Sequence, residues 1–236
     1  MAIIVKNTTF PSLLDLLAPH SCRGCGTLGT VLCDCCKKNI INSHFNFCPV
    51  CKAKKSTTSC PHCPDLPGTF IVGSRQDLIG QLVSDLKFHS VRALAKPLAE
   101  ILNAILLTEL PDNNQKLILV PLPTIKKHVR ARGLDHTLLI AKHLAKLRPS
   151  CTVEQLLIRH QNTVQVGADA ATRRSQATSA YTLNPKLKIG QTATYLLLDD
   201  VWTTGASMLA AAKVAQKAGI KLANLKLAVL AVSSLN

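Results

Sequence analysis

The sequence is poor in aromatic residues. Only 3% of its 236 residues are Phe, Trp or Tyr, whereas 47% are hydrophobic, so we expect an aliphatic core of Leu, Ala, Val and Ile. An apolar content this high excludes a chain that is disordered throughout. The scarcity of aromatic side chains also leaves few platforms on which nucleic-acid bases could stack.

Acidic residues are also few. Asp and Glu number 13 against 28 Lys and Arg, which gives a formal net charge of +15 at pH 7. Such a surplus favours polyanionic partners: nucleic acid, phosphorylated small molecules or an anionic membrane surface. A chain of this length can form one sizeable core and a small satellite module.

Long apolar runs and an export signal are missing as well. No stretch reaches the roughly 18 uncharged apolar residues of a membrane-spanning helix, so no membrane span is expected. Asp15 interrupts the second apolar run of residues 1–19, unlike a secretory signal, and this N-terminal segment is predicted to be amphipathic. We therefore expect a cytoplasmic protein.

Cysteine, in contrast, is abundant. Eight of the ten cysteines form four Cys-x-x-Cys pairs within residues 20–66. Two thiolates separated by two residues can bind one tetrahedral ion from a single tight turn, and two such turns complete a four-thiolate site. The pairs predict a small double zinc-ribbon module with about two structural zinc ions. Disulfides are the competing interpretation, but they would not persist in a reducing compartment.

The order of the cysteines suggests how they share the ions. Sequential pairing gives one site formed by Cys22, Cys25, Cys33 and Cys36 and another formed by Cys48, Cys51, Cys60 and Cys63. An interleaved arrangement is the alternative, and Cys35 or His62 could also enter a site. Sites closed by four thiolates are not catalytic, so we expect a docking module that depends on its metal for stability.

Residues 70–236 alternate between strand and helix patterns. Apolar residues at helical spacing predict helices over 76–89, 91–110, 134–147 and 205–219. Pro97 predicts a break or kink in the second of these. Short apolar runs predict strands over 116–123, 151–158, 195–200 and 224–232. This alternation is typical of an α/β fold, a mainly parallel sheet with helices on both faces.

The most informative stretch is "YLLLDDVWTTGAS", residues 195–207. An apolar strand ends in Asp199 and Asp200 and is followed by a turn rich in hydroxyls. Ligands of parallel sheets bind beyond the carboxyl ends of the strands. Two carboxylates would repel a phosphate, so we expect this pair to face neutral donors such as sugar hydroxyls.

The turn after the acidic pair is suited to an anion. Its backbone N–H groups, the dipole of the following helix and three hydroxyls can surround a phosphate, and a glycine lets the backbone approach closely. The candidate phosphate ligands are Thr203, Thr204, Gly205, Ala206 and Ser207. The whole stretch therefore predicts a sugar-phosphate site.

This stretch is similar to the phosphoribosyl-pyrophosphate motif of type I phosphoribosyltransferases. Four Cys-x-x-Cys pairs, then "VPLPTIKKHVRARGLDHT", then "LIRHQNTVQVGADAATRR", precede it, an order that resembles the ComF family, also called GntX-like or amidophosphoribosyltransferase-like. The resemblance covers residues 10–231. It implies a type I phosphoribosyltransferase-like domain in which the acidic pair holds the ribose hydroxyls and the turn holds the 5′-phosphate of magnesium-bound phosphoribosyl pyrophosphate.

The resemblance also implies where other anions bind. In phosphoribosyltransferases the loop after the first strand holds pyrophosphate, and a long mobile loop closes over the site. The corresponding candidates for pyrophosphate or nucleic acid are Lys126, Lys127, Arg130, Arg132, Arg159, Arg173 and Arg174. Eight Lys and Arg against Asp135 alone within 116–148 exceed what one diphosphate needs, and the surplus is suited to a nucleic-acid backbone.

Two departures from the family pattern concern the chemistry. Asp135 and His136 stand where the family has Asn and Gln, and Thr203 stands where purine-salvage relatives carry an acid. No catalytic residue is identified. We therefore expect a competence protein of the ComF type that binds phosphoribosyl pyrophosphate and single-stranded DNA, with a DNA-translocation ATPase or other competence proteins as partners. A phosphoribosyltransferase with an unidentified small acceptor is the alternative, and a non-catalytic ligand sensor is a third.

Overall fold

The computed structural model describes residues 20–111, 115–160, 180–190 and 192–233. The expected amphipathic segment 1–19 and the candidate ligands Arg173 and Arg174 lie outside the described residues. Within them, every helix is too short or too polar to cross a bilayer.

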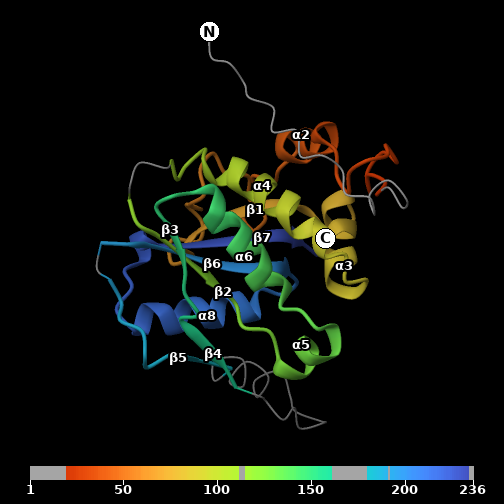
Figure 1. Cartoon of the computed structure of the whole chain (residues 1–236). Coiled ribbons are helices and arrows are strands. Elements are labelled where there is room, and N and C mark those ends of the chain that lie inside the picture. The colour runs from red at the N-terminus through yellow and green to blue at the C-terminus, as the bar shows by residue number, and fades with distance from the viewer. Residues whose placement is uncertain (1–19, 112–114, 161–179, 191, 234–236) are drawn as a thin grey trace, which may run out of the picture.

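A five-stranded sheet forms the centre of the structure (Figure 1). The strand order is β1-β7-β6-β2-β3, and all neighbouring strands are parallel. The strands are β1 (Gly68–Ser74), β2 (Leu117–Pro121), β3 (Cys151–Val153), β6 (Thr194–Trp202) and β7 (Leu225–Val232). Because both faces are covered, the central strands are apolar almost throughout, as expected for a parallel sheet.

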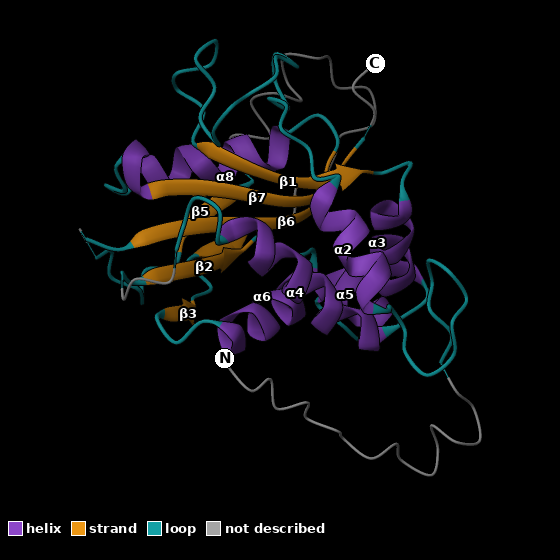
Figure 2. Ribbon diagram, turned by 90° about the horizontal axis from the view of Figure 1, so that it is seen from above, coloured by secondary structure: helices purple, strands orange, loops and turns teal. Residues whose placement is uncertain are grey.

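Helices cover both faces of the sheet (Figure 2). On one face lie α3 (Leu78–Phe88), α4 (Ala95–Leu106) and α6 (His136–Leu147), and on the other lies α8 (Ala206–Lys217). Along β6, Leu196 and Leu198 belong to the first core, and Tyr195 and Leu197 belong to the second. This alternation confirms the predicted α/β class: a parallel sheet between two helical layers.

Two details differ from the expected elements. Pro97 lies in the first turn of α4, just after the short helix η1 (Arg92–Leu94), where a missing N–H removes no intrahelical hydrogen bond, so it does not break the helix. The single strand predicted over 151–158 is wrong. Only β3 joins the main sheet, while β4 (Leu157–Arg159) pairs antiparallel with β5 (Tyr181–Leu183).

Four of the strands and α-helices were not predicted. They are α2 (Asp34–Asn42), strand β1 at the sheet edge, α5 (Lys126–Arg132), where a loop was expected, and strand β5. Strand β1 begins before residue 70, the expected start of the second domain. A 3₁₀ turn, η2 (Leu222–Asn224), leads into β7.

The first half of the cysteine-rich region packs directly on the sheet domain. Cys22, Leu32, Cys36 and Ile40 belong to the same apolar cluster as the buried faces of α3 and α4. Ion pairs reinforce this contact, with Arg23 Nε 3.4 Å from Asp85 Oδ2 and Lys37 Nζ 2.7 Å from Glu100 Oε2. The first ribbon therefore shares its core with the parallel-sheet domain.

The second half is held by buried polar contacts. Lys55 is 5% exposed, and its ammonium donates to the carbonyl oxygens of Thr58 and Thr69, at 3.0 and 2.9 Å. Glu109 Oε2, beyond the end of α4, accepts hydrogen bonds from the N–H and hydroxyl of Thr58. These bonds fix the segment between two cysteine pairs against β1.

Replacing Gly80 by alanine tests the packing of α3. A Cβ at Gly80 would lie 2.0 Å from the carbonyl oxygen of Arg75, a backbone atom that cannot move away cheaply. We expect Gly80→Ala to lower the free energy of unfolding by about 1–3 kcal/mol or more, measured by urea denaturation. The control is Gly190→Ala, whose Cβ would meet the Tyr195 hydroxyl at an ordinary 3.7 Å. Equal stability of the two variants would contradict this packing.

Candidate functional site

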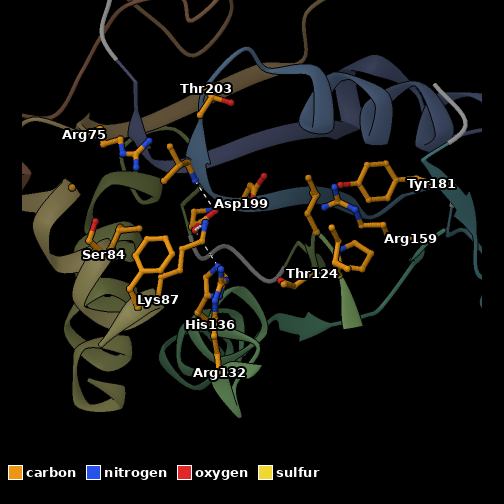
Figure 3. Close-up of a pocket in the computed structure, with 18 residues that line it drawn as sticks. Arg75, Ser84, Lys87, Thr124, Arg132, His136, Arg159, Tyr181, Asp199 and Thr203 are labelled. Atoms are coloured by element: carbon orange, nitrogen blue, oxygen red, sulfur yellow. Dashed lines mark hydrogen bonds and ion pairs between the residues drawn. The ribbon is translucent and has the colours of Figure 1, made fainter. Parts of the chain in front are cut away.

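A cavity of about 400 Å³ lies at the carboxyl edge of the sheet (Figure 3). Its walls come from the ends of β1, β2 and β6, from α3, and from the beginning of α6. In Figure 3, Arg75 lies on one side of the cavity, while Arg159 and Tyr181 of the β4–β5 hairpin lie on the other. Parallel sheets commonly bind ligands at this edge.

The acidic pair lines this cavity, but its two carboxyl groups have different partners. Asp200 is 5% exposed, and its Oδ2 lies 2.5 Å from Lys87 Nζ and 3.0 Å from His136 Nε2. Its Oδ1 accepts the N–H of Val201, and Asp199 Oδ1 accepts the N–H of Asp200. Asp200 is therefore already fully engaged by protein groups.

This arrangement separates the pKa values of the two carboxyl groups. Burial raises the pKa of Asp199 to about 8, and the adjacent charge of Asp200 adds to the shift. Burial also disfavours the ionised form of Asp200, but the hydrogen bond from His136 and the charge of Lys87 outweigh it and hold the pKa well below its usual range. At neutral pH the pair therefore carries about one negative charge.

We expected both carboxylates to face neutral sugar hydroxyls, but the structure differs for Asp200, whose carboxylate is bound by Lys87 and His136. Asp199 is therefore the carboxyl group of the pair that can bind a ligand in the cavity. A protonated carboxyl can both donate a hydrogen bond to a hydroxyl and accept one from it.

A second, smaller hollow of about 50 Å³ lies at the N-terminus of α8. All five predicted phosphate ligands line it: Thr203, Thr204, Gly205, Ala206 and Ser207. The N-cap residue Gly205 makes no side-chain hydrogen bond, and the hydroxyl of Thr204 accepts the Ala206 N–H at 3.4 Å. The positive end of the helix dipole lies at this hollow. The hollow is adjacent to the larger cavity, because Asp199, Val201 and Thr203 line both.

Gly205 is required for this turn. Its φ is 75°, in the left-handed region, and a Cβ there would lie 2.2 Å from the ring of Trp202. The Trp202 ring packs against the turn, and only glycine, which has no Cβ, fits between the ring and the hollow.

The predicted basic residues are divided among several places. Arg132 and Arg159 line the cavity, Arg130 lines a separate hollow of about 330 Å³, and Lys127 is exposed. Lys126 begins α5, and its side chain lies outside the described part of the structure. The structure therefore brings two of the four candidates with described side chains to the cavity.

Several cavity residues were not predicted as ligands. Arg75 follows β1, and recognition of that strand would have placed it at the carboxyl edge. Lys87 lay within a predicted helix, with no sequence signal that it meets Asp200. Tyr181 is buried beneath Arg159, whose guanidinium carbon lies 5.5 Å from the ring centroid, and burial raises the pKa of its hydroxyl.

The eight paired cysteines form two groups, as sequential pairing predicts. One group contains Cys22, Cys25, Cys33 and Cys36, and the other contains Cys48, Cys51, Cys60 and Cys63. Within each group the four Sγ atoms lie within 4.8 Å of one another. All ten cysteines lie in the described ranges and none of them forms a disulfide there, and Cys35 is exposed outside both groups.

The groups fit a tetrahedral ion. Zinc–sulfur bonds of about 2.3 Å place tetrahedral sulfur atoms roughly 3.8 Å apart. Sulfur separations are 3.6 Å for Cys25–Cys33, 3.5 Å for Cys51–Cys60 and 3.9 Å for Cys48–Cys63. Burial alone would raise the pKa of Cys22, but backbone N–H groups, chiefly that of Cys33, lower it to about 6, which favours a thiolate. The two groups can hold about two structural metal ions.

Comparison with known proteins finds no match: no protein-family model matches the chain, and no curated protein is significantly similar to it.

The metal assignment predicts a stepwise loss of metal. Purified protein should contain about two metal ions per chain by elemental analysis, and Cys25→Ser should contain about one, because a ligand of a single group is lost. Cys35→Ser, which changes an exposed thiol close in sequence, should keep both. Metal loss from Cys35→Ser but not from Cys25→Ser would contradict the grouping.

The raised pKa of Asp199 predicts a pH-dependent stability. Between about pH 6 and pH 8 the folded protein holds a proton on Asp199 that the unfolded chain, with a carboxyl pKa of about 3.9, releases. The free energy of unfolding should therefore fall as the pH rises, by up to about 1.4 kcal/mol per pH unit from this group.

Urea denaturation at several pH values checks this dependence. In Asp199→Asn the free energy of unfolding should no longer fall with pH through this group. Asp65→Asn, a change at an exposed carboxyl, should keep the wild-type dependence on pH. Parallel profiles for all three proteins would show that Asp199 is not protonated in the folded state.

Proposed function

We propose that the protein binds phosphoribosyl pyrophosphate across the two adjacent hollows at the carboxyl edge of the sheet. The observation that carries this proposal is their juxtaposition: a phosphate-sized hollow at the N-terminus of α8 lies beside a larger cavity with a carboxyl group and several cations. The 5′-phosphate would occupy the smaller hollow, and the ribose would lie against Asp199.

The charges of the larger cavity suit a diphosphate. Four cations line it, Arg75, Lys87, Arg132 and Arg159, against one ionised carboxylate, because Asp199 is protonated in the empty site. Lys87 neutralises Asp200, which would otherwise repel the ligand. The diphosphate would thus enter a cavity of net positive charge.

Magnesium is expected to enter with the diphosphate. Mg²⁺ is usually bound through one or two carboxylates together with substrate phosphate oxygens, so the ligand oxygens and Asp199 form a suitable set. A bound cation would also favour the ionised form of Asp199. Magnesium would therefore join the ribose end of the cavity to its phosphate end.

A single-stranded DNA partner and a role in DNA uptake complete the proposal. They are supported by the net charge of +15, by the exposed basic residues of α5 and by the resemblance to the ComF family. The two cysteine groups, as zinc ribbons, would serve as the docking surface for a DNA-translocation ATPase or another competence protein.

One observation favours transfer chemistry as a second function. The hollow of about 330 Å³ shares Pro123 and Thr124 with the main cavity and could hold an acceptor beside the ribose. In such a transfer the bond from the anomeric carbon to pyrophosphate breaks and a bond to the acceptor forms. The cavity cations would stabilise the leaving pyrophosphate, and orientation would supply most of the rate enhancement.

Changing Ala206 tests the phosphate hollow without disturbing the fold. Ala206 is exposed at the first position of α8, where a glutamate is favourable for the helix but brings a carboxylate to the hollow. In calorimetric titration with phosphoribosyl pyrophosphate and magnesium, we expect Ala206→Glu to weaken binding about tenfold or more through charge repulsion.

Ala206→Gln is the matched control, since it adds nearly the same volume without charge. It should bind more tightly than Ala206→Glu. Equal affinities of the two variants would place the phosphate elsewhere, and no binding by the wild-type protein would end the proposal.

A further inference from the structure

The rim of the main cavity carries an exposed aromatic side chain. Phe88, the last residue of α3, is 57% exposed and lines the cavity. In a chain with only 3% aromatic residues, most large apolar side chains are buried in the two cores. Exposing a phenyl ring gives up the free energy of burying it, so the ring contributes little to folding where it stands.

Two cations of the same cavity flank this ring. The Arg132 guanidinium carbon lies 5.2 Å from the ring centroid, and Lys87 Nζ lies 5.8 Å from it. Both distances are within the range of cation–π attraction. An exposed aromatic ring and two cations therefore occur together at the rim of the cavity.

The backbone around the ring is held in place before any ligand binds. Arg92, which follows α3, donates a hydrogen bond of 3.0 Å to the carbonyl oxygen of Gly133, which ends α5 directly after Arg132. On α3 itself, Asp85 Oδ1 lies 2.9 Å from Nδ1 of His89, the residue after Phe88. These contacts fix the two helix ends that carry Phe88 and Arg132, which lowers the entropy cost of using them for binding.

We propose that Phe88 and Arg132 form a stacking platform for a nucleobase attached to the sugar phosphate in the cavity. The inference rests on the proposed function, because the neighbouring hollows must hold the phosphate and the sugar. A planar base can stack on the phenyl ring or the guanidinium while its phosphate meets the adjacent cations. The ligand class is therefore a nucleotide, supplied either as a free mononucleotide or as one unit of a single strand.

Two probes that differ only by the base test this platform. Ribose 5-phosphate and AMP are titrated calorimetrically into the full-length, metal-loaded protein. AMP should bind more tightly than ribose 5-phosphate. Phe88→Ala should weaken AMP binding about 5- to 150-fold, the usual effect of losing one stacked base, and leave ribose 5-phosphate binding unchanged.

Two variants separate stacking from other effects. Phe88→Trp keeps an aromatic surface and should retain AMP binding. Leu147→Ala removes another exposed apolar side chain, at the end of α6 and outside the cavity lining, and should change neither titration. Equal weakening of both probes by Phe88→Ala would mean that the ring only supports the fold, and this would overturn the platform.

A third titration, with a 5′-phosphorylated thymidine octamer, identifies the source of the base. If Phe88→Ala weakens binding of AMP or of the octamer while ribose 5-phosphate binding is unchanged, the platform is supported, and the affected probe shows whether the base comes from a free nucleotide or a single strand. If Phe88→Ala weakens binding of neither probe, the platform is overturned. If ribose 5-phosphate binds but a base adds no affinity, the platform is wrong while the sugar-phosphate site stands. If neither ribose 5-phosphate nor either base-carrying probe binds, the platform fails, and the titration with phosphoribosyl pyrophosphate decides the proposed function separately.

Discussion

The contact of Asp200 with Lys87 and His136 determines the character of the candidate site. It joins three elements that are distant in sequence, β6, α3 and α6, and the Asp200 carboxylate is almost fully buried between them. A buried charge is tolerated only when it is paired and hydrogen-bonded, so each of the three residues depends on the others. Burial raises the pKa of its neighbour Asp199, the charge that this contact keeps on Asp200 adds to the shift, and Asp199 lines the cavity.

The same helix connects this contact to the first cysteine group. Lys87 of α3 meets Asp200, while Asp85, half a turn earlier, meets Arg23 between two cysteine ligands of that group. Gly24 lies so close to Cys36 and Leu78 that a Cβ there would clash with both. A metal ion bound by the first cysteine group would therefore also support α3, which carries Lys87 and Phe88 to the cavity.

The parts that could be predicted from the sequence are those with local signals. Alternating apolar runs predict the parallel sheet, the cysteine spacing predicts both four-thiolate groups, and residues 203–207 predict the hollow at the start of α8. The parts that were missed depend on long-range contacts. Lys87 lies 113 residues from its partner Asp200, and Arg75 reaches the cavity only because β1 joins the sheet edge.

The basic side chains of α5 lie on two sides of the helix, and this arrangement suits both proposed ligands, the sugar diphosphate and the single strand. Arg132 faces the cavity, whereas Lys127 and Arg130 on the same short helix are exposed. A diphosphate in the cavity would already meet three arginines besides the paired Lys87, so the outward-facing residues would have no role toward it. They would instead meet the phosphates of a longer polyanion whose terminal nucleotide enters the cavity beside Phe88. A small sugar diphosphate and a single strand would then compete for Arg132, and the basic surplus of the sequence would follow from the second ligand.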